Sequence, residues 1–181
     1  AECINHIPAY VTQLSQPWEK ALEYLSDLFK SADVIVAHNA DFDRKWFGKP
    51  PLPLVDKPWL CSMEDIKWPL DRNLRSRPSV RDLALAYGVP VWNAHRALTD
   101  CMYLAEVFIR CEELESLILK GMEPRKLMKA LVSYEKRHLA KEAGFRWNEP
   151  VKGAWTRRLS DQEIKDLPFS VSKVDVPICE E

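Results

Sequence analysis

The spacing of apolar residues along the first third of the chain predicts an amphipathic helix followed by a buried strand. Apolar side chains recur three and four positions apart between Pro17 and Lys30, the period of a helix that covers a core with one face. The apolar run from Val34 to Ala37 has the length and composition of a short strand. It leads directly into a helical segment that carries Asp41 and Asp43 among aromatic residues. The sequence therefore predicts carboxylates at the mouth of a sheet.

A second group of elements is predicted further along the chain. Trp59 to Cys61 has the pattern of a short strand, and a short helix capped by Ser62 is expected after it. A helix from Ser79 to Tyr87 ends at a glycine. A longer helix runs from Asn93, its expected N-cap, to Phe108, and Asp100 falls on its apolar stripe. The stripe consists of Ala97, Leu104, Val107 and Phe108. A carboxylate at such a position indicates a role other than packing.

The last third of the chain has the pattern of a small α+β module. The predicted elements are a strand at 129–134, a helix at 135–143, a hairpin of 145–147 with 154–159, a helix at 161–167 capped by Ser160, and a strand at 169–174. With 181 residues, 46% of them hydrophobic, the chain can bury the core of one medium domain and one small one. We expect the domains to be residues 1–116 and 117–181.

Two motifs carry a resemblance to a known family. Residues 37–43 read AHNADFD and residues 95–100 read HRALTD. They resemble the second and third motifs of the DEDDh 3′-to-5′ exonucleases, the DnaQ-like members of the ribonuclease H-like superfamily. The resemblance covers residues 4 to 110 and implies an α/β fold of the ribonuclease H-like type. It also implies that Asp43 and Asp100 bind metal and that His95 is the general base.

The chemistry that the resemblance implies is hydrolysis of phosphodiester bonds at single-stranded 3′ ends of DNA or RNA. Two divalent ions, Mg²⁺ or Mn²⁺, would stabilise charge on the attacking and leaving oxygens. Such hard ions favour carboxylate ligands, and an imidazole can accept a proton from water near neutral pH. His38, Asn39 and Phe42 would shape the pocket for the terminal nucleotide. No motif encodes a contact to the 2′-hydroxyl, so the choice between DNA and RNA stays open.

Helix geometry restricts how His95 and Asp100 can meet. Five residues along a helix correspond to about 500° of rotation, which would leave the two side chains about 140° apart. They can converge only if His95 precedes the helix or lies in its first turn. The simpler alternative for Asp41, and for Asp43 taken alone, is a solvated acid that interacts favourably with the start of a helix.

The family's first motif, an Asp-x-Glu pair on the first strand, is expected to be absent from this chain. Residues 4–14 already resemble the segment that follows the family's first three strands. Three explanations are open: a piece of a longer exonuclease, a degenerate gene, or a site completed by another chain. The expected sheet is incomplete and would expose apolar surface. A homo-oligomer or the C-terminal segment could cover that surface.

Charge is distributed unevenly along the chain. Residues 125–158 contain ten Lys and Arg against three Asp and Glu, a net charge of +7, although the whole chain has a net charge of −1. Aromatic residues lie among these cations: Tyr134, Phe145, Trp147 and Trp155. This composition suits either a nucleic-acid backbone with stacked bases or a solvated basic face over a small aromatic core. Residues 132–159 weakly resemble a small domain found beside primases, helicases and nucleases.

The remaining features set the alternatives for function. Five widely spaced cysteines without a CxxC pair, and no apolar run long enough to span a membrane, favour a cytoplasmic protein with reduced thiols. The basic loop with Arg72, Arg75 and Arg77 could contact phosphates or could simply be solvated. Besides the exonuclease, we retain two alternatives: a catalytically inactive nucleic-acid-binding protein derived from the same fold, and a structural scaffold.

Overall fold

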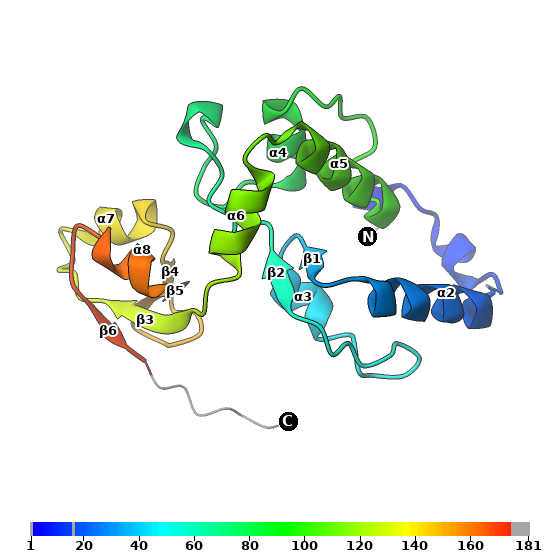
Figure 1. Cartoon of the computed structure of the whole chain (residues 1–181), viewed down its shortest axis with the longest axis horizontal. Coiled ribbons are helices and arrows are strands. Elements are labelled where there is room, and N and C mark those ends of the chain that lie inside the picture. Colours follow the sequence, from blue (N-terminus) through cyan, green and yellow to red (C-terminus); the bar gives the residue numbers. More distant parts are fainter. Residues whose placement is uncertain (1, 16, 175–181) are drawn as a thin grey trace. The chain divides into compact units, whose positions relative to one another are not determined.

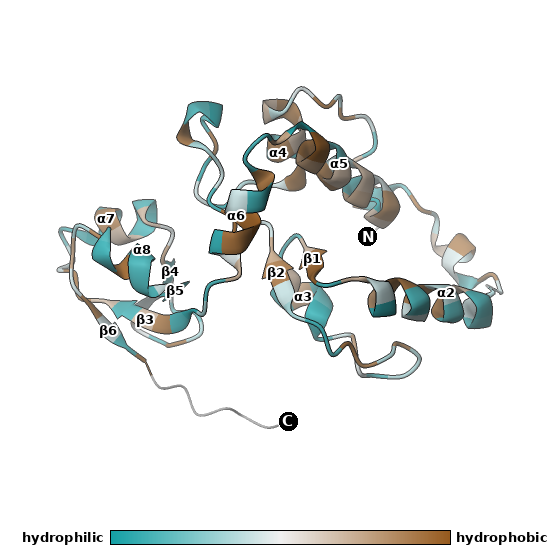
Figure 2. Cartoon of the chain, in the orientation of Figure 1, coloured by the Kyte–Doolittle hydropathy of each residue, from teal (hydrophilic) through white to brown (hydrophobic). Residues whose placement is uncertain are grey.

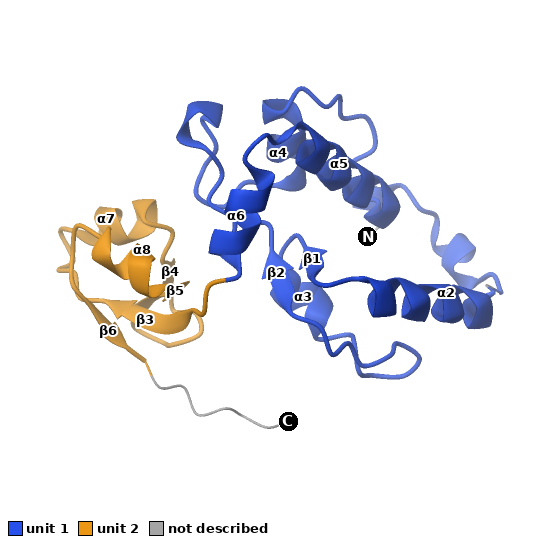
Figure 3. Cartoon of the chain, in the orientation of Figure 1, with its two compact units in different colours: residues 1–122 blue, residues 123–181 orange. Residues whose placement is uncertain are grey.

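The chain forms two compact units. In the computed structural model, which describes residues 2–15 and 17–174, the units are Ala1–Met122 and Glu123–Glu181 (Figure 3). The unit boundary lies a few residues later than the expected domain boundary. Helix α6 (Leu114–Gly121) accounts for the difference, because its Leu117 is buried in the core of the first unit.

The first unit is built on two short parallel strands. β1 (Ile35–Ala37) pairs with β2 (Trp59–Cys61), and Val36 lies opposite Leu60, which is fully buried. Helix α3 (Ala40–Arg44) follows β1 after a single turn, and the backbone N–H of Ala40 lies 3.4 Å from the Cys61 sulfur. The predicted order of strand, carboxylate-bearing helix and second strand is therefore confirmed (Figure 1).

Helices supply most of the core of the first unit. α4 (Val80–Ala86) packs on α5 (Ala97–Arg110), and side chains from both helices meet Leu60 of β2 in one cluster. The fully buried members include Leu83 and Val107. Shorter elements complete this unit: the helix α1 (Glu2–Asn5) and the 3₁₀ helices η1 (Ala9–Gln13) and η2 (Leu70–Arg72).

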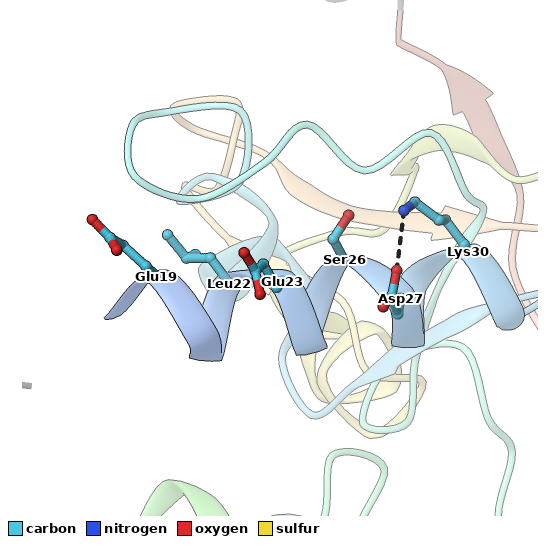
Figure 4. A pocket seen from close by; sticks show the side chains of 6 residues that line it. All are labelled: Glu19, Leu22, Glu23, Ser26, Asp27 and Lys30. Carbon is cyan, nitrogen blue, oxygen red and sulfur yellow. Dashed lines mark hydrogen bonds and ion pairs between the residues drawn. The ribbon is translucent and has the colours of Figure 1, made fainter. Parts of the chain in front are cut away.

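The amphipathic helix predicted after Pro17 is present as α2 (Trp18–Ser31), but it is not packed as expected. None of its residues is buried, and Trp18 and Tyr24 expose 58% and 69% of their surface. Figure 2 shows hydrophilic and hydrophobic residues alternating along this helix, and Figure 4 shows a hollow along it. The hollow is lined by side chains of α2 alone: Glu19, Leu22, Glu23, Ser26, Asp27 and Lys30. It contains none of the predicted site residues.

Two predicted helix starts are wrong. Residues 62–65 form turns rather than a helix, and the Ser62 hydroxyl contacts His38 instead of capping. The N-cap of α5 is Arg96, not Asn93. The backbone N–H of Asn93 donates instead to the Tyr103 hydroxyl, which draws the preceding segment across the helix. By contrast, Ser79 caps α4 as its sequence suggests, with a full capping box.

The second unit contains the predicted hairpin within a four-stranded antiparallel sheet. Its strands are β3 (Lys126–Ala130), β4 (Arg146–Trp147), β5 (Trp155–Leu159) and β6 (Val171–Lys173), in the order β4-β5-β3-β6. Helices α7 (Arg137–Glu142) and α8 (Asp161–Lys165) contribute to its core, and Ser160 caps α8 as predicted. The predicted mixture of helices and strands is thus confirmed at the level of an α/β class.

Candidate functional site

The turn between β1 and α3 presents the first motif. Asn39 takes a left-handed conformation, with φ of 71°, and precedes the first residue of α3. This conformation is costly for most side chains but is tolerated by asparagine. One turn later, Asp43 is half-buried, and this burial raises the pKa of its carboxyl. Partial burial therefore makes the ionised carboxylate of Asp43 less favourable on its own. Binding of a proton or a cation would offset that cost.

The second motif brings His95 and Asp100 together in the way that helix geometry requires. His95 lies ahead of α5, with φ of 68°, and its backbone N–H donates to Oδ1 of Asp100 at 3.2 Å. Asp100 lies in the first turn of α5. His95 therefore has one of the two placements, ahead of the helix or in its first turn, that would allow its ring to approach Asp100. The residue is exposed, which leaves its ring accessible to solvent.

The negative charges of Asp43 and Asp100 both affect the pKa of the Cys101 thiol. Cys101 is exposed overall, but partial desolvation of its thiol raises its pKa, and the negative charges of Asp100 and Asp43 raise it further. Asp100 adjoins Cys101 in α5, whereas Asp43 belongs to a different helix. Asp43 therefore lies near enough to Cys101 to influence the pKa of its thiol, although it belongs to a different helix.

The remaining residues of the first motif differ in their accessibility. His38 Nδ1 lies 3.0 Å from the hydroxyl oxygen of Ser62, which is fully buried, so this ring is directed inward. Phe42 is 52% exposed, and the Lys45 ammonium lies 4.3 Å from the centre of its ring. Asp41 is exposed on the same helix. Of the three predicted pocket residues, Phe42 presents the largest surface for a stacked base.

The inward-facing His38 predicts a pH dependence of stability. Burial lowers the pKa of His38, partly opposed by nearby carboxylates that include Asp100. Below about pH 6.5 the His38 imidazole is protonated more fully in the unfolded chain than in the folded chain. The free energy of unfolding therefore falls as pH drops through this range. We expect urea denaturation to show this loss between pH 7.5 and 5.5, and His38→Gln to reduce it. An unchanged slope in the variant would assign the pH dependence to other groups.

Tyr103 and Arg96 are structural supports of the site that sequence reasoning missed. The buried Tyr103 hydroxyl accepts the backbone N–H groups of Trp92 and Asn93 at 3.0 and 3.1 Å. Arg96 donates from Nε to the carbonyl of Asn5 at 3.1 Å, which ties the N-terminal segment to the start of α5. In the sequence, the one indication of this role is that Tyr103 places a phenol hydroxyl on the apolar stripe of the helix, where a buried hydroxyl needs a hydrogen-bond partner.

Removing the Tyr103 hydroxyl should loosen the segment that carries His95. Tyr103→Phe leaves two partly buried N–H groups without their acceptor, at an expected cost of about 1–3 kcal/mol in the free energy of unfolding. Amide hydrogen exchange at residues 92–95 should become faster. Tyr134→Phe is the matched control, because Tyr134 is 79% exposed. Equal behaviour of the two variants would show that the Tyr103 hydroxyl does not hold this segment.

Within residues 2–15 and 17–174, no three His, Cys, Asp or Glu side chains gather closely enough to hold a metal ion. The chemistry of the predicted pair still fits Mg²⁺ or Mn²⁺, since both ligands are carboxylates and Asp43 is partly desolvated. A complete site for these ions would need ligands beyond this pair.

One Asp-x-Glu triplet does occur in the chain, Asp161-Gln162-Glu163, but not on a first strand. It lies in the second unit, at the start of α8, where Glu163 accepts the backbone N–H of Ser160 at 2.9 Å. Glu163 also pairs with Arg125, and Asp161 pairs with Lys126 at 2.8 Å. These contacts give the triplet a capping and ion-pairing role.

The arginines of the basic loop have partners within the first unit. Arg75 pairs with Asp82 at 2.9 Å, and Arg77 pairs with Glu64 at 2.5 Å. Arg72 lies over the ring of Tyr87, 4.6 Å from its centre. These contacts favour a structural role for the loop over phosphate binding.

Among the described cysteines, Cys61 and Cys111 are buried, and Cys3 and Cys101 are exposed; all four are free thiols. Cys179 lies outside the described residues. None of the helices in the described part of the chain is both long and apolar enough to cross a membrane.

Comparison with known proteins finds a match in the second unit. The family model of a domain of unknown function, DUF8626, matches residues 126–174, which run from the start of β3 to just after β6. No curated protein and no solved structure matches the chain.

Proposed function

We propose that the first unit has a ribonuclease H-like fold and carries part of the active site of a metal-dependent 3′-to-5′ exonuclease. One observation supports this proposal above the others. Asp43 from α3 and Asp100 from α5 both act on the Cys101 thiol, and His95 is hydrogen-bonded through its backbone to Asp100.

Each residue has a distinct role in the proposed reaction. Asp43 and Asp100 hold Mg²⁺ or Mn²⁺, and His95, exposed beside Asp100, takes a proton from the attacking water. Bound divalent ions supply charge stabilisation for the attacking and leaving oxygens. The water oxygen joins phosphorus, the bond from phosphorus to the 3′ oxygen of the penultimate nucleotide breaks, and a nucleoside 5′-monophosphate leaves. Phe42 offers its exposed ring to the terminal base.

The proposed chemistry needs more carboxylates than this pair. Two divalent ions are held by several carboxylates in enzymes of this kind, and Asp161 and Glu163 are already engaged within the second unit. Asp161 and Glu163 are therefore poor candidates for the further ligands. The free thiols of the described cysteines fit a reducing compartment such as the cytoplasm.

Single-stranded DNA and RNA labelled at the 5′ end test the proposal, using the full-length protein and Mg²⁺. The expected result is a ladder that shortens from the 3′ end, releases mononucleotides and disappears with EDTA. His95→Ala should abolish the ladder, whereas His138→Ala, at an exposed position of α7, should leave it unchanged. Internal cuts, or equal activity of the two variants, would contradict the proposal.

The second candidate function is a nucleic-acid-binding protein without catalysis. It is favoured by the net charge of +7 over residues 125–158 and by the lack of a third metal ligand among the described side chains. This candidate predicts salt-sensitive binding of single strands with no nucleotide release at any metal concentration.

A further inference from the structure

The four-stranded sheet of the second unit has two different faces. Residues paired across antiparallel strands share a face, and successive residues along a strand alternate between faces. Met128, Ala130 and Leu159 point to the face that packs in the core with Ala140 of α7 and Ile164 of α8. The opposite face carries residues from each strand of the sheet: Leu127, Lys129, Arg146, Thr156, Arg158 and Ser172.

Cations on the two faces are in different surroundings. On the helix-covered face, Lys126 pairs with Asp161 at 2.8 Å, and Arg157 pairs with Glu163 at 3.5 Å. On the opposite face, Lys129 and Arg158 are exposed, and the six strand residues named above include no carboxylate. On that face Arg146 pairs with Glu149 at 3.4 Å, so the positive charge of the opposite side is centred on Lys129 and Arg158.

Apolar surface adjoins these cations. Leu127 lies directly opposite Arg158, and Leu131, just beyond β3, is 55% exposed. Tyr134 follows with 79% of its surface exposed and the Arg137 guanidinium 3.8 Å from the centre of its ring. The turn after β4 covers the far end of the face, where the Thr156 hydroxyl donates to the Glu149 carbonyl. The accessible part of the face thus centres on Lys129 and Arg158.

We propose that this face, centred on Lys129 and Arg158 and flanked by Leu127, Leu131 and Tyr134, binds the backbone of single-stranded nucleic acid. The choice of partner rests on the proposed function, which acts on the same class of molecule. Charge complementarity argues for a polyanion, and the neighbouring exposed apolar and aromatic side chains suit unpaired bases, which a duplex would not present. The face does not depend on Asp43, Asp100 or a metal ion.

Binding of fluorescent oligo-dT and oligo-U to the full chain in EDTA tests this assignment. The charge reversal Lys129→Glu/Arg158→Glu should raise Kd at least tenfold. It should also make the dependence of log K on log salt shallower by about 1.4, since each lost phosphate contact on a single strand contributes about 0.7. Lys129→Gln/Arg158→Gln should give a smaller loss. Thermal denaturation checks that each variant keeps the fold.

The matched control is Lys141→Glu/Lys165→Glu, which changes net charge equally at exposed positions of α7 and α8. If both reversals weaken binding equally, net charge and not this face is responsible, and the proposal falls. It falls also if polyglutamate or anionic vesicles compete as well as an oligonucleotide of equal charge, because the site would then select any polyanion. Metal-free binding that depends on Lys129 and Arg158, together with no nucleotide release when Mg²⁺ is supplied, would uphold this proposal and refute the exonuclease.

Discussion

Asp100→Asn is expected to reduce metal-dependent nucleotide release by on the order of 100-fold or more, the scale seen when one group that stabilises a transition state is removed. The substitution removes the negative charge that would hold a divalent ion. It retains Oδ1, which can still accept the backbone N–H of His95, so the start of α5 should keep its structure. The rate of release of a labelled 3′ nucleotide at saturating Mg²⁺ measures the effect.

Asp41→Asn provides the control for that experiment. Asp41 is exposed on α3, two residues from Asp43. Asp41→Asn removes one negative charge, as Asp100→Asn does, but from a position that is not proposed to bind metal. Its rate should stay within about twofold of the unmodified protein, as expected for a surface position away from the reacting groups. If the two variants lose activity equally, general electrostatic attraction of substrate would explain the loss better than a specific metal ligand.

Leu60→Ala should have the largest effect on stability, lowering the free energy of unfolding of the first unit by about 2–5 kcal/mol. Leu60 is fully buried, and it connects the strand pair to the helices that carry Asp100 and Leu117. Its Cδ1 also lies against the backbone of Gly121, so little surrounding structure can move in to fill the cavity. Urea denaturation followed by tryptophan fluorescence measures the change.

Leu54→Ala makes the same chemical change at a position that is 81% exposed. It should alter stability by less than about 0.5 kcal/mol. A similar loss in both variants would mean that the cluster around Leu60 does not hold the first unit together.

Local sequence signals predicted those elements whose ends are stabilised by their own residues. The capping boxes of Ser79 with Asp82 and of Ser160 with Glu163 are visible in the sequence, and both helices begin where these pairs indicate. Ser62 looks equally suited to capping, but its hydroxyl is engaged by His38, a residue distant in sequence. Such long-range competition for a polar group leaves no local signature.

The burial of α2 could not be predicted from its periodicity. A repeating apolar stripe identifies a helix with one face suited to packing, but it does not say whether a partner surface exists. In the structure Trp18, Tyr24 and Leu28 remain largely exposed, whereas Phe29 contacts Phe47 with 5.4 Å between ring centres.

The position of His95 relative to α5 could be narrowed down from the sequence, but the contacts that hold the candidate site in place could not be predicted. Helix arithmetic left two placements in which His95 and Asp100 could meet, ahead of α5 or in its first turn, and His95 lies ahead of α5. The support from Tyr103 depends on the path of residues 92 and 93 across the helix. The shared influence of Asp43 and Asp100 on Cys101 depends on how α3 and α5 pack. Both are tertiary features, which spacing within a motif does not encode.

Nucleotide release from a single-stranded 3′ end is the most direct test of the exonuclease proposal. The measurement compares the 181-residue chain with its Asp100→Asn variant, each with and without Mg²⁺. We predict Mg²⁺-dependent release by the unmodified chain and loss of that release in the variant. Salt-sensitive binding by both, with no release by either, would contradict the exonuclease and favour a nucleic-acid-binding protein.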